Sequence, residues 1–538
     1  MTGENIDPRP GAFPVQAEGI LATSLSTAAT AAPPRATRRE WLGLAVIALP
    51  CLLYAMDLTV LNLALPRIAE DLRPSSAKLL WIVDIYGFFV AGLLITMGNL
   101  GDRIGRRRLL MMGAAAFGLA SVLAASSRSA ATLIAARTLL GIAGATLAPS
   151  TLSLIRNMFL DPRQRTVAIG VWTASYSIGG ALGPVLGGVM LQHFSWGSVF
   201  LLAVPVMALL LLAGPALLPE SRNPTAKPLD LPSAALSLVA VLSLIYGLKS
   251  YVQDGFGALS VASVGAGLLF GVIFVRRQRR LAEPLIDLGL FRVPGFGASV
   301  ATYLLATLVT FGAYVAVGQY LQLVLGLRPL AAGLWLLPWS ASYVAGSFLS
   351  PLLARRIRPT LIMAGGLVCA AAGFVVTSQV AGLGVGAVIA GSTFYALALS
   401  PVFTLGIDAI VTAAPPARAG AAAALSETCS ELGGALGIAV LGSIGTAVYR
   451  ASLSSSAAFA GAPAPARRAA LDTLAGAVAA VAQRPSDAAG QRLLDTARLA
   501  FGHGMEVTLV LCAAVSVAVA VVRLLPSRRG RAEHSGAP

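Results

Sequence analysis

The sequence predicts an all-α polytopic membrane protein. Of its 538 residues, 57% are hydrophobic and only 12% are charged, and the mean hydropathy is +0.79. A soluble domain carries roughly 25% charged residues, so a water-soluble globular protein does not fit this composition. The apolar residues also come in long blocks, each close to the roughly 20 residues that a membrane-spanning helix needs.

Charged residues and Pro- or Gly-rich stretches divide the apolar sequence into fourteen predicted spans. The first six lie at 42–65, 79–99, 109–126, 132–155, 166–190 and 197–218. The other eight lie at 232–250, 258–275, 298–320, 331–353, 360–378, 383–411, 418–448 and 503–525. An even number of spans puts both termini on the same side of the membrane.

The basic residues orient these spans. When the N-terminus is placed in the cytoplasm, most of the 39 Lys and Arg residues fall in cytoplasmic loops, as the positive-inside rule requires. Both termini are therefore predicted to be cytoplasmic, in a multi-pass protein of the cell membrane. The net charge of +16 then reports topology, and no nucleic-acid partner is expected.

Three segments outside the main blocks of spans have their own character. Residues 1–40 are predicted to form a disordered cytoplasmic N-terminal tail and residues 526–538 a basic cytoplasmic tail. The external segment 451–502 is rich in alanine, with charged residues at intervals that suggest two short amphipathic helices. A helical hairpin over the outer face is expected there, with a flexible external loop as the alternative.

The loop after the second span combines glycines, an acid and several arginines. It runs from Gly98 to Arg108 as GNLGDRIGRRR. The glycines allow a tight turn and close helix approach, and the Asp102 carboxylate is favoured at the N-terminal end of the helix that follows. We expect this loop to latch one helical bundle to another and to act in gating, through Gly98, Gly101, Asp102, Arg103, Gly105 and Arg106.

This loop resembles the signature of the Major Facilitator Superfamily, and further stretches agree with it. Leu133–Ala145 resembles the superfamily's fourth-helix arginine motif, and Gly179–Gly188 resembles its fifth-helix antiporter motif. Met56–Pro66 is similar to the first-helix signature of the fourteen-helix drug:proton antiporter branch. Within that branch, the quaternary-ammonium-compound and methyl-viologen exporters resemble this chain at 81–88, 195–205 and 427–437.

The resemblance implies two six-helix bundles around a central cavity, with two extra helices inserted between them. The N-terminal bundle then occupies 41–218, the inserted helices and linkers 219–296, helices nine to thirteen 297–450, and the last span 503–525. Such a protein works by alternating access, and a monomer is expected.

Ionisable residues inside spans are costly and usually mark a pathway for ions or substrate. At 1.5 Å per residue, Asp57 and Asp84 fall in the outer parts of the first two spans, whereas Glu427 and Glu431 fall near mid-membrane. A carboxyl at that depth is desolvated, so it can bind and release a proton near neutral pH. A cation entering the cavity would expel that proton, which predicts exchange by competition. The resemblance carries the substrate and proton roles onto Asp57, Asp84 and Glu427.

Arg137 in the fourth span needs a carboxylate or water to be tolerated. The resemblance implies a part in proton coupling, and structural pairing is the alternative. Glu427 likewise has the alternative of a structural carboxylate paired to Arg137 or to a backbone donor. Ser426 precedes Glu427, so a paired glutamate is absent, and the span 331–353 has no carboxylate. The first departure predicts a narrower charge range or an altered proton stoichiometry, and the second argues against efficient handling of dications.

Small and aromatic residues complete the predicted site. The small-residue face of the fifth span allows close packing and a bend, with packing alone as the alternative; it consists of Gly179, Gly183, Pro184, Gly187 and Gly188. Aromatic rings can stack on a flat or quaternary cation. Two or three such contacts are expected among Tyr54, Trp81, Tyr86, Trp172, Tyr176, Trp339 and Tyr343.

Together these features predict a proton-coupled multidrug exporter, an antiporter of lipophilic cations that uses the proton gradient and no cofactor. The sequence contains no Gly-Lys-Ser/Thr phosphate loop, which argues against an ATP-driven pump. The four cysteines and three histidines lack the spacing of metal ligands. A self-resistance exporter for a natural product and an uptake permease are the near alternatives. A membrane-embedded enzyme or a non-transporting sensor is the alternative of another class, although no nucleophile-elbow serine motif and no soluble output domain are evident.

Overall fold

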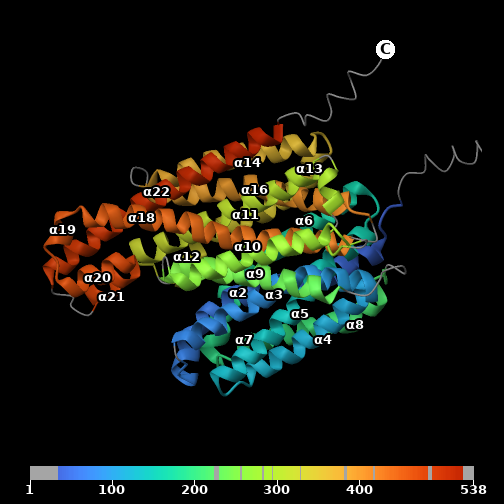
Figure 1. The fold of residues 1–538 in the computed structure, drawn as a ribbon, viewed down its shortest axis with the longest axis horizontal. Helices are drawn as coiled ribbons and strands as arrows, with labels where there is room; N and C mark the ends of the chain where they lie inside the picture. The colour runs from blue at the N-terminus through green and yellow to red at the C-terminus, as the bar shows by residue number, and fades with distance from the viewer. Residues whose placement is uncertain are drawn as a thin grey trace, which may run out of the picture.

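The computed structural model describes residues 34–74, 76–222, 230–254, 257–281, 284–286, 288–293, 295–327, 329–380, 384–415, 419–482 and 487–524. The regular elements in these ranges are all helices, mostly long and packed side by side (Figure 1). The predicted tails fall almost wholly outside the described residues, so their disorder stays a prediction.

Residues 38–217 form the N-terminal bundle. Its helices are α2 (Arg38–Leu72), α3 (Ser76–Ile104), α4 (Arg106–Ala125), α5 (Ala130–Met158), α6 (Pro162–His193), α7 (Ser198–Leu201) and α8 (Ala203–Leu217). α2 packs along α6, and α3 along α5. These contacts place the motif-bearing faces of α2, α3, α5 and α6 inside the bundle.

Two helices, α9 (Leu231–Asp254) and α10 (Ala258–Gln278), are inserted after this bundle and pack on each other. Asp230, just before α9, accepts hydrogen bonds from the Arg277 guanidinium at 2.9 and 3.1 Å. This pairing holds the pKa of the Asp230 carboxyl below its usual range. α9 also touches both α3 and α17, so the inserted pair lies against both bundles.

The C-terminal bundle contains most of the remaining helices. They are α11 (Phe296–Gln319), α12 (Pro329–Trp335), α13 (Leu337–Ala354), α14 (Pro359–Ser378), α16 (Val385–Ala413), α17 (Ala419–Leu436), α18 (Gly442–Ser454) and α22 (Ala488–Leu524). Five-residue π-helical turns follow α11 at Tyr320–Val324 and join α17 to α18 at Gly437–Leu441.

Thirteen helices in the described ranges are long and apolar enough to cross a membrane, close to the fourteen predicted spans. The difference lies in the predicted span 331–353, which the structure divides into α12 and α13 at Leu336. Pro338 stands in the first turn of α13, and a proline has no N–H to continue the hydrogen-bond ladder of a preceding helix. The break is therefore encoded locally.

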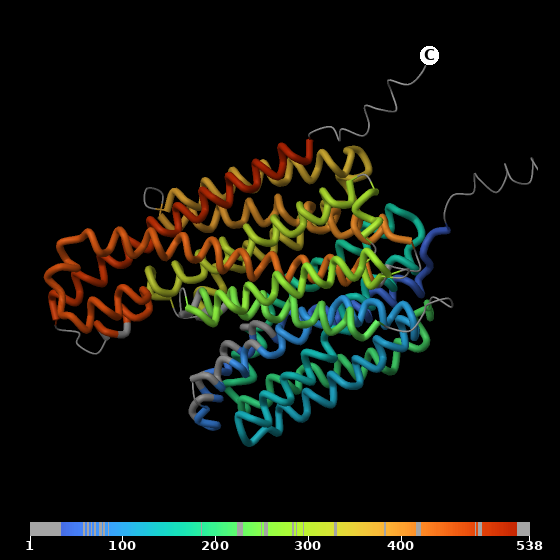
Figure 2. Tube along the Cα trace, viewed as in Figure 1, coloured from blue at the N-terminus to red at the C-terminus, as the bar shows by residue number. Residues whose placement is uncertain are grey.

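The segment between α18 and α22 is helical and forms a cap, made of α19 (Ala457–Ala460), α20 (Ala464–Asp472), α21 (Leu474–Ala482) and the start of α22. Figure 2 shows it projecting at the end of the molecule away from the start of α2. The cap has its own apolar core, which includes Leu453, Leu474 and Leu493. Contrary to the predicted start at 503, α22 begins at Ala488 and runs unbroken for 37 residues.

Candidate functional site

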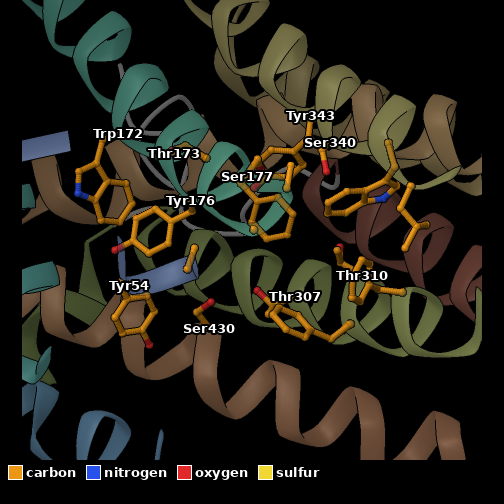
Figure 3. A pocket seen from close by; sticks show the side chains of 18 of the residues that line it. Tyr54, Trp172, Thr173, Tyr176, Ser177, Thr307, Thr310, Ser340, Tyr343 and Ser430 are labelled. Carbon is orange, nitrogen blue, oxygen red and sulfur yellow. The ribbon is translucent and has the colours of Figure 1, made fainter. Parts of the chain in front are cut away.

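A cavity of about 450 Å³ lies between the two bundles (Figure 3). α2 and α6 line it from the N-terminal bundle, and α11, α12, α13, α16 and α17 from the C-terminal bundle. Among the described lining residues there is no Lys, Arg or His, whereas two carboxylates, Glu427 and Glu431, are present. The cavity therefore offers negative charge without a competing fixed cation.

Each bundle contributes a wall of aromatic rings. On the N-terminal side, the Tyr176 ring lies 5.7 Å from that of Tyr54 and 4.8 Å from that of Trp172, between centroids. Figure 3 shows these three residues together on one side of the cavity. On the other side, Trp339 stacks on Tyr343 at 5.7 Å and also contacts Tyr314. Ring faces attract positive charge, so both walls offer surfaces on which a cation can stack.

Trp172 is held in place from behind. Its indole N–H donates to the Thr151 hydroxyl at 3.0 Å, and both side chains are buried. The Cys51 thiol lies 3.8 Å from the same hydroxyl. α2, α5 and α6 thus meet behind the ring, and this contact fixes its orientation toward the cavity.

Of the two carboxylates in the cavity, Glu427 is the one without a polar partner among the residues that the structure describes. It lines the cavity and is 8% exposed, and no hydrogen bond or ion pair joins it to another residue in the described ranges. An ionised carboxylate that is buried without a partner has a high free-energy cost. Such a group therefore favours either a proton or a bound cation. The alternative of pairing with Arg137 does not apply here, because Arg137 pairs elsewhere.

Glu431 lies one turn further along α17 and has a polar partner across the cavity. The Tyr54 hydroxyl donates to its Oε1 at 2.8 Å. Since Tyr54 belongs to α2 and Glu431 to α17, this hydrogen bond links the two bundles.

Arg137 and Asp57 form an ion pair inside the N-terminal bundle. The Arg137 Nη1 lies 2.5 Å from the Asp57 Oδ2, and the Nε donates to the Ile82 carbonyl at 3.2 Å. Asp57 borders a separate cavity of about 20 Å³, together with Phe117, Ser121 and Phe200. Neither member of the pair is among the residues that line the large cavity. The predicted partner acid Asp84 lies on α3, but its side chain falls outside the described part of the structure.

The bundles are latched at the end where α3, α5 and α16 finish and α4, α6 and α17 begin, which we call the basic end. The Arg165 Nε donates to the Asp408 Oδ1 at 3.1 Å, which joins α6 to α16. Arg156 at the end of α5 donates to the carbonyls of Val411 and Ala414. These contacts tie the two bundles together at this end.

The predicted gating loop adds a third latch. Asp102 pairs with Arg106 at 2.6 Å and accepts from the Ala421 N–H, in the first turn of α17, at 3.3 Å. The carboxylate thus faces the N-terminus of α17, in the other bundle, where a negative charge is favoured. The sequence-based expectation named the following helix instead, which is α4. Gly105 makes the sharp turn into α4 with a φ of +111°, and Arg103 lies at the end of α3 with Gly98 and Gly101 before it.

The glycine face of α6 packs mainly within its own bundle. A Cβ at Gly179 would lie 2.1 Å from the Leu52 carbonyl oxygen of α2, and one at Gly187 would lie 2.9 Å from Val60. Gly183 and Pro184 continue the same unbroken helix, and a Cβ at Gly188 would meet open space. The contacts therefore match close packing of α2 on α6; the predicted bending role stays a prediction.

A family model described as the Major Facilitator Superfamily matches residues 47–438. The chain belongs to the Major Facilitator Superfamily. The superfamily fold is also evident from a solved structure, that of the human organic anion transporter MFSD10 (TETRAN). It superposes with a TM-score of 0.58 and 16% identity, covering 89% of this chain and 99% of that one.

Three curated superfamily relatives are similar over most of their length. The multidrug efflux pump LfrA of Mycolicibacterium smegmatis is 44% identical over 93% of this chain and 99% of its own. The methyl viologen resistance protein SmvA of Salmonella typhimurium is 38% identical over 77% and 84%. The tetracenomycin C resistance and export protein of Streptomyces glaucescens is 34% identical over 75% and 76%. Two of these relatives are named for efflux or export and one for resistance. With its superfamily membership and its thirteen apolar helices of membrane-spanning length in the described ranges, this chain is a multi-pass membrane transporter.

Five of the seven predicted aromatic residues line the cavity between the bundles: Tyr54, Trp172, Tyr176, Trp339 and Tyr343. Tyr86 is fully buried behind Tyr54, and Trp81 is 42% exposed on the outside of α3. Both therefore lie outside the lining of this cavity.

Two features of the site were not predicted from the sequence: the residues of α11 that line the cavity, and the latch at the basic end. Tyr303, Thr307, Thr310 and Tyr314 line the cavity from one face of α11. Their spacing of four, three and four residues is helical, and such a polar and aromatic stripe in an apolar span was the available signal. Asp408 carries no comparable pattern, because its partner Arg165 lies 243 residues away in sequence.

Proposed function

We propose that this transporter is a proton-coupled exporter of lipophilic, cationic small molecules, with the proton gradient as its energy source and no cofactor. The observation that carries the proposal is the carboxylate of Glu427, which has no polar partner among the described residues and faces an aromatic cavity whose described lining contains no Lys, Arg or His. Support also comes from relatives named for multidrug efflux, methyl viologen resistance and tetracenomycin export.

Exchange follows from the single charge that Glu427 can hold. A protonated Glu427 is neutral and tolerated in the membrane, whereas an ionised one needs a cation beside it. A substrate cation that docks against it therefore releases the proton, and a returning proton releases the substrate. Opening and closing of the two ends would carry each ligand in one direction, as in alternating access.

The latched basic end gives the proposal a direction. That end carries the arginines that predict the cytoplasmic side, so a closed basic end corresponds to a cavity shut off from the cytoplasm. In this state the exporter would release its substrate outward and take up a proton. Cytoplasmic termini and a monomeric state belong to the same proposal.

The decisive experiment is proton-driven ethidium efflux from proteoliposomes, compared between the parent and Glu427→Gln. The variant keeps the shape of the side chain but cannot exchange a proton, so we expect efflux driven by a pH gradient to disappear. Glu506→Gln is the matched control, because it removes a carboxyl from α22 away from the cavity lining. Efflux by Glu427→Gln at the parental rate would refute the proton role, and parental efflux without a pH gradient would refute antiport.

A self-resistance exporter for a natural product is a second candidate, favoured by the relative named for tetracenomycin C resistance and export. The same vesicles distinguish it, because a neutral polyaromatic compound would then be exported in preference to ethidium.

A further inference from the structure

One glycine of α6 allows the two bundles to meet backbone to backbone. α6 packs along α13 of the other bundle. A Cβ at Gly170 of α6 would lie only 2.7 Å from the carbonyl oxygen of Ser347 in α13. A carbon atom cannot come so close to that oxygen without a collision, so the approach of these two helices requires a glycine at this position.

This contact lies between the cavity and the latch at the basic end. Trp172, on α6 just after Gly170, lines the cavity, and so does Tyr343, one turn before Ser347 on α13. Arg165, on α6 before Gly170, belongs to the latch. The contact therefore stands where a path from the basic end to the cavity would have to pass.

The junction around this contact is filled by buried side chains. Thr404 of α16 completes it, with its Cγ2 3.9 Å from the position of a Cβ at Gly170. Gly170, Ser347 and Thr404 are all buried, and none of them is among the described residues that line the cavity. Three helices from both bundles thus meet here and leave the junction outside the cavity.

α13 is held against α16, so it cannot easily move away from α6. The Ser400 hydroxyl of α16 donates to the Tyr343 carbonyl at 2.6 Å. A Cβ at Gly346 would lie 2.6 Å from the Leu397 carbonyl oxygen, so these two helices also touch backbone to backbone. A side chain at Gly170 would therefore be relieved by separation of the two bundles rather than by a shift of α13 alone.

We propose that Gly170 is the positioning residue that seals the cavity from the basic end: its missing Cβ lets α6 and α13 close on each other, and a larger side chain holds the bundles apart there. The collision is with a backbone atom, which no change of rotamer removes. It lies between the bundles, so the packing inside each bundle is left intact. This inference concerns access to the cavity and goes beyond the proton exchange of the proposed function.

Thr404 supplies a reporter for access to the junction. Its side chain is fully buried, and its hydroxyl has no hydrogen-bond partner in the described part of the chain. Thr404→Cys therefore removes no hydrogen bond seen there and places a thiol of similar size at the junction. The thiol can react with a water-soluble reagent only when water reaches this point between the bundles.

The test is the labelling rate of Thr404→Cys in the full-length protein without its four native cysteines. The reagent is an anionic methanethiosulfonate that does not cross membranes, added to vesicles of either orientation. Gly170→Ala should raise the rate roughly five- to thirtyfold, as expected for overpacking of a close contact. The rise should occur only in vesicles that expose the basic end, and Gly170→Val should raise the rate further.

Gly373→Ala is the matched control, because it makes an equal collision inside one bundle. A Cβ at Gly373 of α14 would lie 2.7 Å from the backbone nitrogen of Tyr395 in α16. This variant should lower the thermal midpoint but leave the labelling of Thr404→Cys unchanged. Gly170→Ala should keep a higher midpoint than Gly373→Ala, because the bundles can part.

Three outcomes would overturn the seal. They are a parental labelling rate for Gly170→Ala, an equal rise for Gly373→Ala, and a Gly170→Ala protein that unfolds as readily as Gly373→Ala. The last result would show that the contact belongs to the fold and cannot be relieved by separation. Labelling needs neither a proton gradient nor a substrate, so failure of the proposed proton exchange would leave these results unaffected.

Discussion

Thr151 holds the ring of Trp172, and so determines the shape of one aromatic wall of the cavity. Thr151 offers the indole N–H its hydrogen bond, and neither group can turn to water instead. A buried donor left without its partner costs about 1–3 kcal/mol. The ring would relieve that cost by turning, which would change the shape of the cavity.

We therefore expect Thr151→Val to raise the ethidium Kd by roughly three- to tenfold while the protein remains folded. Ethidium titration and the thermal midpoint measure the two quantities. Thr377→Val is the matched control, since the Thr377 hydroxyl donates only to the Gly373 carbonyl of its own helix. Equal affinities for the parent and Thr151→Val would show that Trp172 does not contact the ligand.

At the same scale, the sequence is informative about chemistry but not about partners. Glu427 is recognisable as a membrane carboxylate because an acid in an apolar span is rare. The Tyr54–Glu431 hydrogen bond is not recognisable, because its two residues are 377 positions apart in sequence. Pairing across bundles depends on three-dimensional packing, which the periodicity of one helix does not contain.

At the scale of elements, the glycines of α6 decide how closely it approaches α2. A Cβ at Gly179 would collide with the Leu52 carbonyl oxygen, which is backbone and cannot turn aside. We expect Gly179→Ala to destabilise the protein by about 1–3 kcal/mol through overpacking, measured as a lower thermal midpoint in detergent.

Gly188→Ala on the same helix is the matched control, because open space surrounds its Cβ position. It should leave the midpoint unchanged or raise it slightly, since alanine favours a helix over glycine. A stable Gly179→Ala protein would mean that α2 and α6 can separate without cost.

The break between α12 and α13 is a second element-scale feature with a consequence. Gly333, Leu334 and Leu336 at the break line the cavity, so the interrupted helix shapes the binding space. We expect Pro338→Ala to favour a continuous helix and to slow ethidium efflux without loss of folding. Pro359→Ala, in the first turn of α14, is the control and should transport normally. Unchanged efflux by Pro338→Ala would show that the break is dispensable.

Element prediction from the sequence worked where one signal dominates. Long apolar blocks locate the spans, because burying about 20 apolar residues in lipid outweighs local preferences. The apolar signal also led to the prediction of one continuous span at 331–353, although Pro338 inside it indicated a possible break. It also hid the early start of α22, since 488–502 is amphipathic rather than apolar and packs against the cap.

At the scale of the whole molecule, the basic-end latch is expected to hold the two bundles together on one side of the cavity. Arg165 and Asp408 are both partly buried, with side chains 16% and 19% exposed. Removing such a pair would weaken the latch, and a loss of about 1–2 kcal/mol changes the ratio of two states by a factor of roughly 5–30. The conformational balance therefore rests on a few polar contacts.

We expect Asp408→Asn to lengthen the distance between spin labels at Arg163 and Arg355, which lie in different bundles at the exposed surface. Pulsed electron paramagnetic resonance on a variant without native cysteines would measure it. Asp495→Asn, which removes an exposed pair with Arg498 in the cap region, should leave the distribution unchanged. An unaltered distribution for Asp408→Asn would place the closure elsewhere.

The length of α22 connects two places that are otherwise far apart. At about 1.5 Å per residue, its 37 residues extend for roughly 55 Å, well beyond the hydrocarbon core of about 30 Å. One end packs in the cap and the other beside α11 and α14. A rigid rod of this kind tilts as a unit, so an antibody fragment bound to the cap could hold or report the conformation of the transmembrane region without entering the bilayer.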